Sequence, residues 1–296
     1  MMNQKQIVLT FKESELQGEK FSQHLGLEHS IINIHKFPDG ESLVTVPDKL
    51  PEHTIFFRSL DRPNDKLIEL LLASKTARNH GAKRLTLIAP YLCYMRQDIE
   101  NNPGEAISQR IIGQLLADIF DDVITVDSHL HRINQLEQAI PLKNAVNLLS
   151  THEMTTFLAS HFNNAIIFGP DSESEQWVSE VASSINFDFA VATKIRKSDR
   201  HVEITIPDKN YHNEIVVIVD DMASTGRTIG LAAQQLKQQG AAEVHALVTH
   251  ALFMGDAKDY LKKHGVDNIW STDSITDESN KVELTILLAN ALLDIQ

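Results

Sequence analysis

The sequence predicts an α/β protein made of two similar units, each a mainly parallel sheet flanked by helices. Short apolar runs alternate with helical patterns along the chain. The run at 215–219 (Ile-Val-Val-Ile-Val) lacks the polar alternation of a half-exposed strand, as expected for a strand buried on both faces. A length of 296 residues suffices for two domains of about 150 residues each. In addition, two segments recur roughly half a chain apart.

The recurring segments indicate a duplicated unit. Residues 81–85 follow a helical pattern and open a strand, and residues 240–244 do the same. Residues 122–128 are likewise echoed by 267–274. Self-similarity of this kind is typical of a repeated supersecondary arrangement. We therefore expect two domains, with the boundary at 145/146.

The local patterns predict the elements in order. Pro38-Asp39-Gly40 is turn chemistry and separates two strand-like runs, while Gly81 ends the first long helical pattern. Strands are expected at 7–11, 31–34, 42–46, 85–89, 123–126, 165–168, 202–206 and 215–219, and helices at 65–80, 152–162 and 229–239.

Composition narrows the classes of function. The net charge of −13 argues against broad binding to nucleic acids or anionic membranes, since both require a positive field. The single cysteine, Cys93, excludes an internal disulfide framework and is expected in the core. No apolar run approaches about 18 residues and residues 1–6 carry no signal pattern, so we expect a cytoplasmic protein. Phosphate ligands would then need local basic residues and a metal ion.

One segment carries a specific chemical signal. The predicted strand at 215–219 is followed by Asp220 and Asp221, then by a turn of small residues at 224–228 and a helix. Backbone N–H groups at a helix N-terminus favour a phosphate. The two carboxylates suit sugar hydroxyls, bound directly or through a divalent cation. The pattern predicts a sugar-phosphate site; the alternative is an ordinary strand-to-helix turn with capping residues.

Residues 220–228 resemble the phosphoribosyl pyrophosphate (PRPP) loop of type I phosphoribosyltransferases and of ribose-phosphate pyrophosphokinases. The loop alone does not separate these two families. Pyrophosphokinases of this kind are two phosphoribosyltransferase-like domains in tandem. The resemblance thus implies such a domain at 1–145 with the ATP-binding elements, and another at 146–296 with the ribose 5-phosphate loop and the catalytic loop.

Several further segments resemble the pyrophosphokinases alone. Residues 37–41 match their Phe-x-Asp-Gly-Glu turn, which reaches a nucleotide across a subunit interface, and residues 90–98 match their ATP-binding loop. Residues 127–129 are similar to their Asp-Leu-His segment, whose histidine contacts the MgATP phosphates, and residues 194–196 to their catalytic Lys-x-Arg. The implied ATP-binding residues are Phe37, Asp39, Glu41, Arg96, Gln97 and His129, and the implied catalytic residues are Lys194 and Arg196.

The loop at 169–175 resembles the family's Pro-Asp-x-Gly-Gly segment but departs from it. Asp171 holds the metal-associated position, whereas Glu173 and Ser174 replace the glycines that let backbone amides approach a pyrophosphate. The same letters have a structural interpretation, in which Ser172 caps the following helix with Glu175 in the reciprocal position.

The resemblance implies a ribose-phosphate diphosphokinase that converts MgATP and ribose 5-phosphate to PRPP and AMP. It implies Mg²⁺ near His129 and Asp171, and a homo-oligomer with its active site near a subunit interface. The ribose 5-phosphate site would comprise Asp220, Asp221, Ser224, Thr225, Gly226 and Thr228. Three alternatives stay open: a catalytically silent regulatory relative, a phosphoribosyltransferase that uses PRPP, and a kinase that passes one phosphoryl group to a ribose phosphate.

Overall fold

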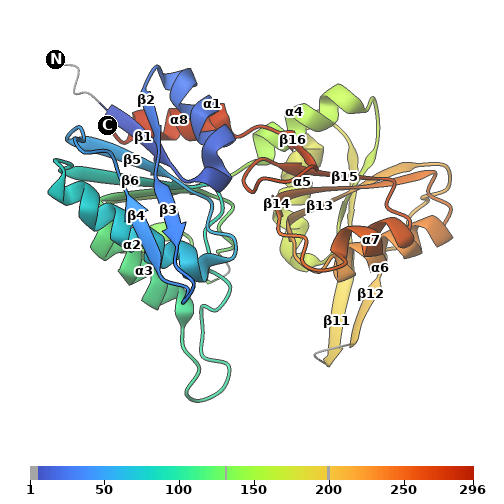
Figure 1. The fold of residues 1–296 in the computed structure, drawn as a ribbon. Coiled ribbons are helices and arrows are strands. Elements are labelled where there is room, and N and C mark those ends of the chain that lie inside the picture. The colour runs from blue at the N-terminus through green and yellow to red at the C-terminus, as the bar shows by residue number, and fades with distance from the viewer. Residues whose placement is uncertain (1–5, 131, 199–200) are drawn as a thin grey trace. The chain divides into compact units, whose positions relative to one another are not determined.

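The computed structural model describes residues 6–130, 132–198 and 201–296, and within these ranges all side chains except those at 176, 194–198 and 201–203 (Figure 1). The chain forms two compact units. The first contains the described residues up to Leu149 together with Thr285–Gln296, and the second contains Ser150–Leu284.

The first unit is a six-stranded parallel sheet covered by helices on both faces. Helix α1 packs against α8 on one face, and α2 packs against α3 on the other (Figure 1). An antiparallel pair, β3 (Asn33–Lys36) and β4 (Ser42–Thr45), follows the second strand. The sheet order is β2 (Glu28–Ile31), β1 (Gln6–Thr10), β5 (His53–Phe57), β6 (Arg84–Ala89), β7 (Asp122–Val126) and β8 (Asn144–Leu148). The helices are α1 (Glu15–Leu25), α2 (Pro63–Asn79), α3 (Ser108–Ile119) and α8 (Thr285–Asp294), with 3₁₀ turns η1 (Lys12–Ser14) and η2 (Leu136–Gln138).

The second unit repeats this plan. Helix α4 packs against α5, and α6 packs against α7. The antiparallel pair β11 (Thr193–Ser198) and β12 (His201–Thr205) again follows the second strand. The parallel sheet order is β10 (Asp188–Val191), β9 (Ile166–Gly169), β13 (Ile215–Ala223), β14 (Glu243–Ala251), β15 (Asn268–Thr272) and β16 (Asn280–Val282). The helices are α4 (Thr151–His161), α5 (Glu175–Ile185), α6 (Arg227–Gln238) and α7 (Ala257–Lys263), with the 3₁₀ turn η3 (Ser172–Ser174).

The predicted duplication is confirmed in topology and in detail. Both sheets have their strands in the order second, first, third, fourth, fifth, sixth. The recurring sequence segments lead into equivalent strands, β6 and β14 for one pair and β7 and β15 for the other. Just before each fifth strand, an aspartate accepts hydrogen bonds from the backbone of the fourth strand and from a basic residue: Asp121 from Leu85 and Arg78, and Asp267 from Val244 and Lys237.

The last helix differs from the sequence prediction, which placed 146–296 in one domain. Helix α8 belongs to the first unit, where it contacts α1, β7 and β8. Its Leu288 and Leu292 are buried, and the Ile295 carbonyl accepts a hydrogen bond from Arg84 at 2.9 Å. The pair formed by α8 and α1 in the first unit corresponds to the pair formed by α4 and α5 in the second unit. Because its apolar side is buried against the first unit, α8 belongs to that unit although it follows the second unit in the sequence.

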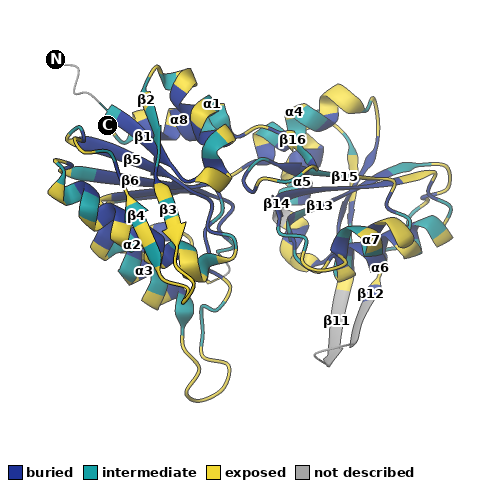
Figure 2. Ribbon diagram, viewed as in Figure 1, coloured by how far each residue is buried: buried dark blue, intermediate teal, exposed yellow. Residues whose placement is uncertain are grey.

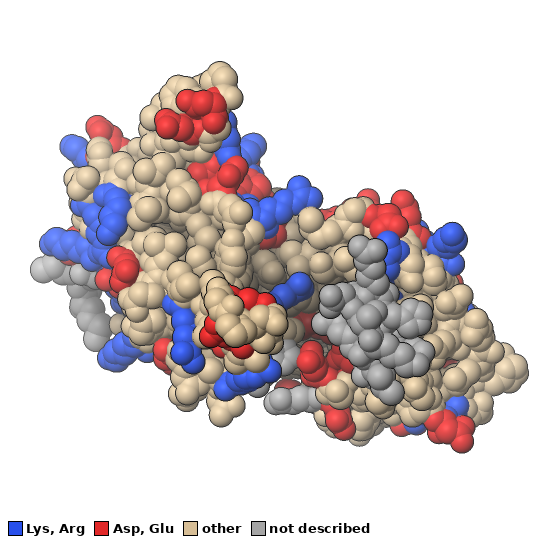
Figure 3. All heavy atoms as spheres, turned by 90° about the horizontal axis from the view of Figure 1, so that it is seen from below, with Lys and Arg blue, Asp and Glu red and all other residues tan. Residues whose placement is uncertain are grey.

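Burial follows the layered arrangement. Figure 2 shows the strands of both sheets largely buried, with the exposed positions on the outer sides of the helices and in the loops. On the face shown in Figure 3, basic and acidic side chains of the described residues are interspersed rather than gathered by sign. None of the helices in the described part of the chain combines the length and apolar character that a membrane span requires.

Candidate active site

The acidic pair lies within the central strand of the second unit, not after it. Strand β13 runs to Ala223, four residues beyond the predicted end at Val219. It pairs in parallel with the equally long β14, with Asp220 opposite Val248 and the last pair at Ala223. The backbone of both aspartates is therefore held in the sheet, with Asp221 buried and Asp220 half-buried.

A left-handed glycine joins this strand to helix α6. Gly226 has a φ of 69° and precedes the helix, which begins at Arg227, two residues earlier than predicted. A Cβ there would lie 3.1 Å from Leu261 Cγ, so both the backbone conformation and the space favour glycine. Thr225 is exposed, and Ser224 and Thr228 are half-exposed. The turn thus presents hydroxyls and a helix N-terminus together, as an anion site requires.

The loop after β14 holds this turn in place. The Met254 N–H donates to the Ser224 carbonyl at 2.8 Å, and the Phe253 N–H donates to Ala223 at 2.9 Å. Arg227, the one cation in the turn, is engaged by Asp256: its Nη2 donates to both oxygens of that carboxylate, at 2.8 and 3.0 Å. Local sequence patterns do not indicate this pairing, because Asp256 lies 29 residues further along the chain.

Asp171 lies just past the end of the neighbouring strand β9, where it is 8% exposed. Its carboxylate accepts the Glu173 N–H at 3.2 Å and caps the turn η3, while the Ser174 hydroxyl donates to the Asp171 carbonyl at 2.6 Å. The predicted cap by Ser172 with Glu175 is therefore wrong. Asp171 caps the three-residue 3₁₀ turn, and α5 begins only after Ser174, which makes no side-chain cap hydrogen bond.

Negative charge accumulates where β9 and β13 end. Burial raises the pKa of Asp220 well above its ordinary value, and the charges of Asp221 and Asp171 raise that pKa further. Among the described residues, no three His, Cys, Asp or Glu side chains form a ready metal cage. Mg²⁺ uses only one or two protein carboxylates together with water and phosphate oxygens, so a group of carboxylate oxygens at this position fits it without a complete protein cage.

The predicted catalytic pair lies on an adjoining hairpin. The backbone of Lys194 pairs with Ile204 and that of Arg196 with Val202, across the antiparallel strands β11 and β12. The Lys194 and Arg196 side chains lie outside the described residues. Their catalytic roles stay a prediction.

In the first unit, residues 37–41 form the tight hairpin turn that their chemistry predicts. The Phe37 N–H donates to the Glu41 carbonyl at 2.8 Å, and the Gly40 N–H donates back to Phe37 at 2.9 Å. Asp39 accepts the Glu41 N–H at 3.1 Å, and Gly40 has a φ of 95°. Phe37 is 43% exposed at the tip. An exposed aromatic ring on a rigid turn is suited to stacking on a ligand or a partner surface.

Arg96 and Gln97 lie on the long loop between β6 and α3, which projects from the unit in Figure 1. Arg96 is exposed at the surface. The Gln97 side chain donates to the Ile99 carbonyl at 2.8 Å, and Glu105 accepts hydrogen bonds from the backbone at Asn101 and Asn102. The loop is therefore stabilised by its own polar contacts.

His129 follows the adjacent strand β7 in an unusual backbone conformation. Both Asp127 and His129 have positive φ, 39° and 57°, which non-glycine residues adopt rarely and mostly at functional sites. The Ser128 N–H, between them, donates to Asn147 at 2.9 Å. Since β6 and β7 are parallel neighbours, the structure brings the Arg96 loop and His129 to one edge of the sheet, where ligands of such sheets bind. The sequence did not indicate the positive φ values.

The resemblance implies that His129 and Asp171 lie together near a metal ion. His129 belongs to the first unit and Asp171 to the second. Their joint role therefore stays a prediction.

A parallel sheet whose central strand carries an acidic pair and leads through a glycine turn to a helix N-terminus defines a phosphoribosyltransferase-type domain, here in a duplicated fold. Residues 135–284 match the phosphoribosyl transferase domain family, and residues 6–119 match the N-terminal domain of ribose phosphate pyrophosphokinase. The ribose-phosphate pyrophosphokinase of Methanopyrus kandleri is 32% identical over 97% of this chain and 98% of its own length. The chain belongs to the ribose-phosphate pyrophosphokinase family.

Other comparisons agree with this assignment. The ribose-phosphate pyrophosphokinase of Campylobacter jejuni is 32% identical over 87% of this chain and 84% of its own. The crystal structure of phosphoribosylpyrophosphate synthetase from Mycobacterium smegmatis superposes with a TM-score of 0.82 over 98% of both chains, at 20% identity. This similarity supports the assignment of the fold.

Proposed function

We propose that the protein is a ribose-phosphate diphosphokinase, which transfers the pyrophosphoryl group of MgATP to the anomeric hydroxyl of ribose 5-phosphate and yields PRPP and AMP. The observation that carries the proposal is the set of carboxylates Asp171, Asp220 and Asp221 beside the glycine turn of α6. Family membership over nearly the whole chain supports it.

In this proposal, the second unit binds the acceptor sugar. The Asp220 and Asp221 carboxylates accept hydrogen bonds from the ribose hydroxyls and orient the ring. The 5-phosphate lies at the N-terminus of α6, where backbone N–H groups and hydroxyls stabilise its charge. The phosphate-binding residues are Ser224, Thr225, Gly226 and Thr228.

ATP binds through residues of the first unit: Arg96, Gln97 and His129, with Phe37, Asp39 and Glu41 supplied by a neighbouring subunit of a homo-oligomer. Mg²⁺, held near His129 and Asp171, would neutralise charge on the polyphosphate when bound. The exposed Phe37 ring and the placement of Arg96 and His129 at one sheet edge support these assignments.

The reaction is a direct displacement. The anomeric oxygen forms a bond to the β-phosphorus of ATP, the bond from that phosphorus to the AMP oxygen breaks, and the hydroxyl proton is released. Lys194 and Arg196 stabilise the charge that develops on the transferred group. Alignment and charge neutralisation, without a covalent enzyme intermediate, lower the barrier.

The changed loop at 171–175 favours a second candidate, a catalytically silent regulatory relative. The N–H groups of Glu173 and Ser174 are both bonded to Asp171 within the turn η3. They are thus occupied internally in the place where the family's glycines offer backbone to a pyrophosphate.

One assay separates the candidates. The protein is incubated with ribose 5-phosphate and MgATP, and the nucleotide product is identified by chromatography. AMP with PRPP supports the proposal, whereas ADP indicates a kinase that passes one phosphoryl group. Absence of turnover, with ribose 5-phosphate binding retained, indicates the regulatory relative. Consumption of PRPP with a free base would indicate a phosphoribosyltransferase.

A further inference from the structure

The β3–β4 hairpin has two different faces. Side chains alternate along a strand, so Ile34 and Lys36 of β3 lie on the same face as Ser42 and Val44 of β4. Ile34 and Val44 are half-buried against the core of the first unit, while Leu43 on the other face is 52% exposed. The hairpin thus rests on the unit through one face, apolar near its base and polar near its turn.

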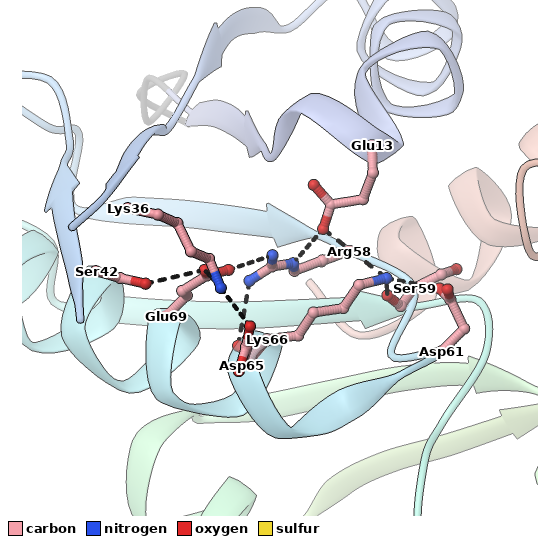
Figure 4. Close-up of polar contacts among 9 residues, drawn as sticks. All are labelled: Glu13, Lys36, Ser42, Arg58, Ser59, Asp61, Asp65, Lys66 and Glu69. Carbon is pink, nitrogen blue, oxygen red and sulfur yellow. Dashed lines mark hydrogen bonds and ion pairs between the residues drawn. The ribbon is translucent and has the colours of Figure 1, made fainter. Parts of the chain in front are cut away.

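Glu69 of α2 contacts both strands just below the turn (Figure 4). Its Oε1 accepts the Ser42 hydroxyl at 3.2 Å and lies 3.4 Å from the Lys36 ammonium. Lys36 and Ser42 face each other in the strand register and flank the turn directly. Lys36 also pairs with Asp65 on the same helix. One buried carboxylate therefore ties both ends of the turn to a long helix.

The other oxygen of Glu69 fixes the carboxylate itself. Arg58 Nη2 donates to Glu69 Oε2 at 2.5 Å, and both side chains are about 4% exposed or less. Arg58 is held in turn by Glu13 at 2.7 Å and by the Phe11 ring, whose centre lies 3.6 Å from the guanidinium carbon. The Glu69 carboxylate is therefore held in position by contacts that do not involve the hairpin.

Polar contacts decide the position of the hairpin near its turn. Lys36, Arg58 and Glu69 line a cavity of about 580 Å³, so apolar packing does not fill the space between this part of the hairpin and the unit. Hydrogen bonds and ion pairs to a buried carboxylate such as that of Glu69 are stronger than neutral hydrogen bonds and are directional. They can therefore fix a short two-stranded ribbon that would be marginally stable alone.

We propose that Glu69, through Lys36 and Ser42, is a positioning residue that fixes the turn 37–41 in the orientation needed to bind the nucleotide. The inference rests on the proposed function, in which Phe37, Asp39 and Glu41 contact ATP. Glu69 itself does not contact substrate. Loss of its contacts should weaken ATP binding and leave ribose 5-phosphate binding unchanged, because the sugar site is built from the second unit.

The test removes the hairpin side of the contacts and keeps the buried Arg58–Glu69 pair, whose disruption would endanger folding. The double variant Lys36→Gln with Ser42→Ala is compared with Lys36→Arg, which retains the charge. Lys12→Gln is the matched control: Lys12 lines the same cavity but is 82% exposed and, among the described residues, forms an ion pair with Glu15 rather than with the hairpin. Hydrogen exchange at residues 37–41 is measured without ligand, and KM is measured for both substrates.

We expect faster exchange at 37–41 in the double variant and a roughly tenfold higher KM for ATP, the size of one net hydrogen bond to a charged group. Lys36→Arg should restore much of both, and the KM for ribose 5-phosphate should stay unchanged. Unaltered exchange at the turn, faster exchange without a change in ATP KM, or equal effects of Lys12→Gln would each overturn the inference. Absence of turnover in the unaltered protein would instead refute the proposed function, while exchange would still test the contacts of Glu69.

Discussion

Substitution of Leu292 by Ala should destabilise the first unit although Leu292 lies only four residues before Gln296. Its side chain is fully buried on α8, the helix that contacts α1, β7 and β8 of the first unit. Truncation of a buried leucine removes its transfer free energy and leaves a cavity, which together cost about 2–5 kcal/mol. That is a large share of a domain stability of about 5–15 kcal/mol.

The neighbouring residue provides a matched control. Leu293 is 54% exposed on the same helix, so Leu293→Ala makes the same chemical change with the same effect on helix propensity. It should cost no more than about 0.5 kcal/mol. Comparison of the two variants therefore isolates burial from helix formation.

Native-state hydrogen exchange in urea can assign the effect to one unit. We expect the opening free energies of β7 and β8 to fall in Leu292→Ala, whereas those of β13 and β14 stay unchanged. A single global melting curve would not separate the units, because two-domain chains need not unfold in one step. The reasoning is refuted if the second unit loses stability instead, or if Leu293→Ala has the same effect.

Three further predictions concern single side chains. Lys194→Ala should reduce turnover by about 10²–10³ while ribose 5-phosphate binding stays nearly intact, because a preorganised cation is lost; near-normal turnover would contradict the role. Burial alone would raise the pKa of Asp122, but hydrogen bonds from Arg84 and neighbouring polar groups outweigh it and hold the pKa below its ordinary value. Its stabilisation is therefore present above the ordinary pKa of about 3.9 and is lost as the pH falls, and urea melts of Asp122→Asn should show a shallower acid dependence. An unchanged slope would rule this out. Burial also raises the pKa of the Cys93 thiol to about 12, so a thiol reagent at pH 8 should label it only after unfolding; rapid labelling of the folded protein would be inconsistent with this.

Local chemistry predicted several features correctly. Pro-Asp-Gly at 38–40 forms the expected hairpin turn, and the recurring segments at 81–85 and 240–244 lead into equivalent strands. These features depend on residues adjacent in the chain, whose backbone preferences act over a few positions. The alternation of strands and helices and the duplicated α/β plan could be predicted for the same reason.

Local sequence patterns did not predict the length of β13 or the residue that caps the turn before α5. The extension of β13 to Ala223 depends on hydrogen bonds to β14, some 28 residues away by register, and not on the preferences of Asp220 and Asp221. Likewise the cap at Asp171 depends on a 3₁₀ turn that separates it from α5. Sequence motifs can identify the residues proposed for ligand binding. The burial of these residues and the charges near them depend on how the folded chain packs.

The sequence by itself determined the fold class, the duplication and the family, because periodicity and motif chemistry are written in neighbouring residues. Only the tertiary structure decided that α8 belongs to the first unit, that the charges of Asp221 and Asp171 raise the pKa of Asp220, and that Glu69 ties the 37–41 turn to α2. Each of these depends on side chains that are distant in the chain and meet only when apolar surfaces are buried. Burial then determines their charge and their partners.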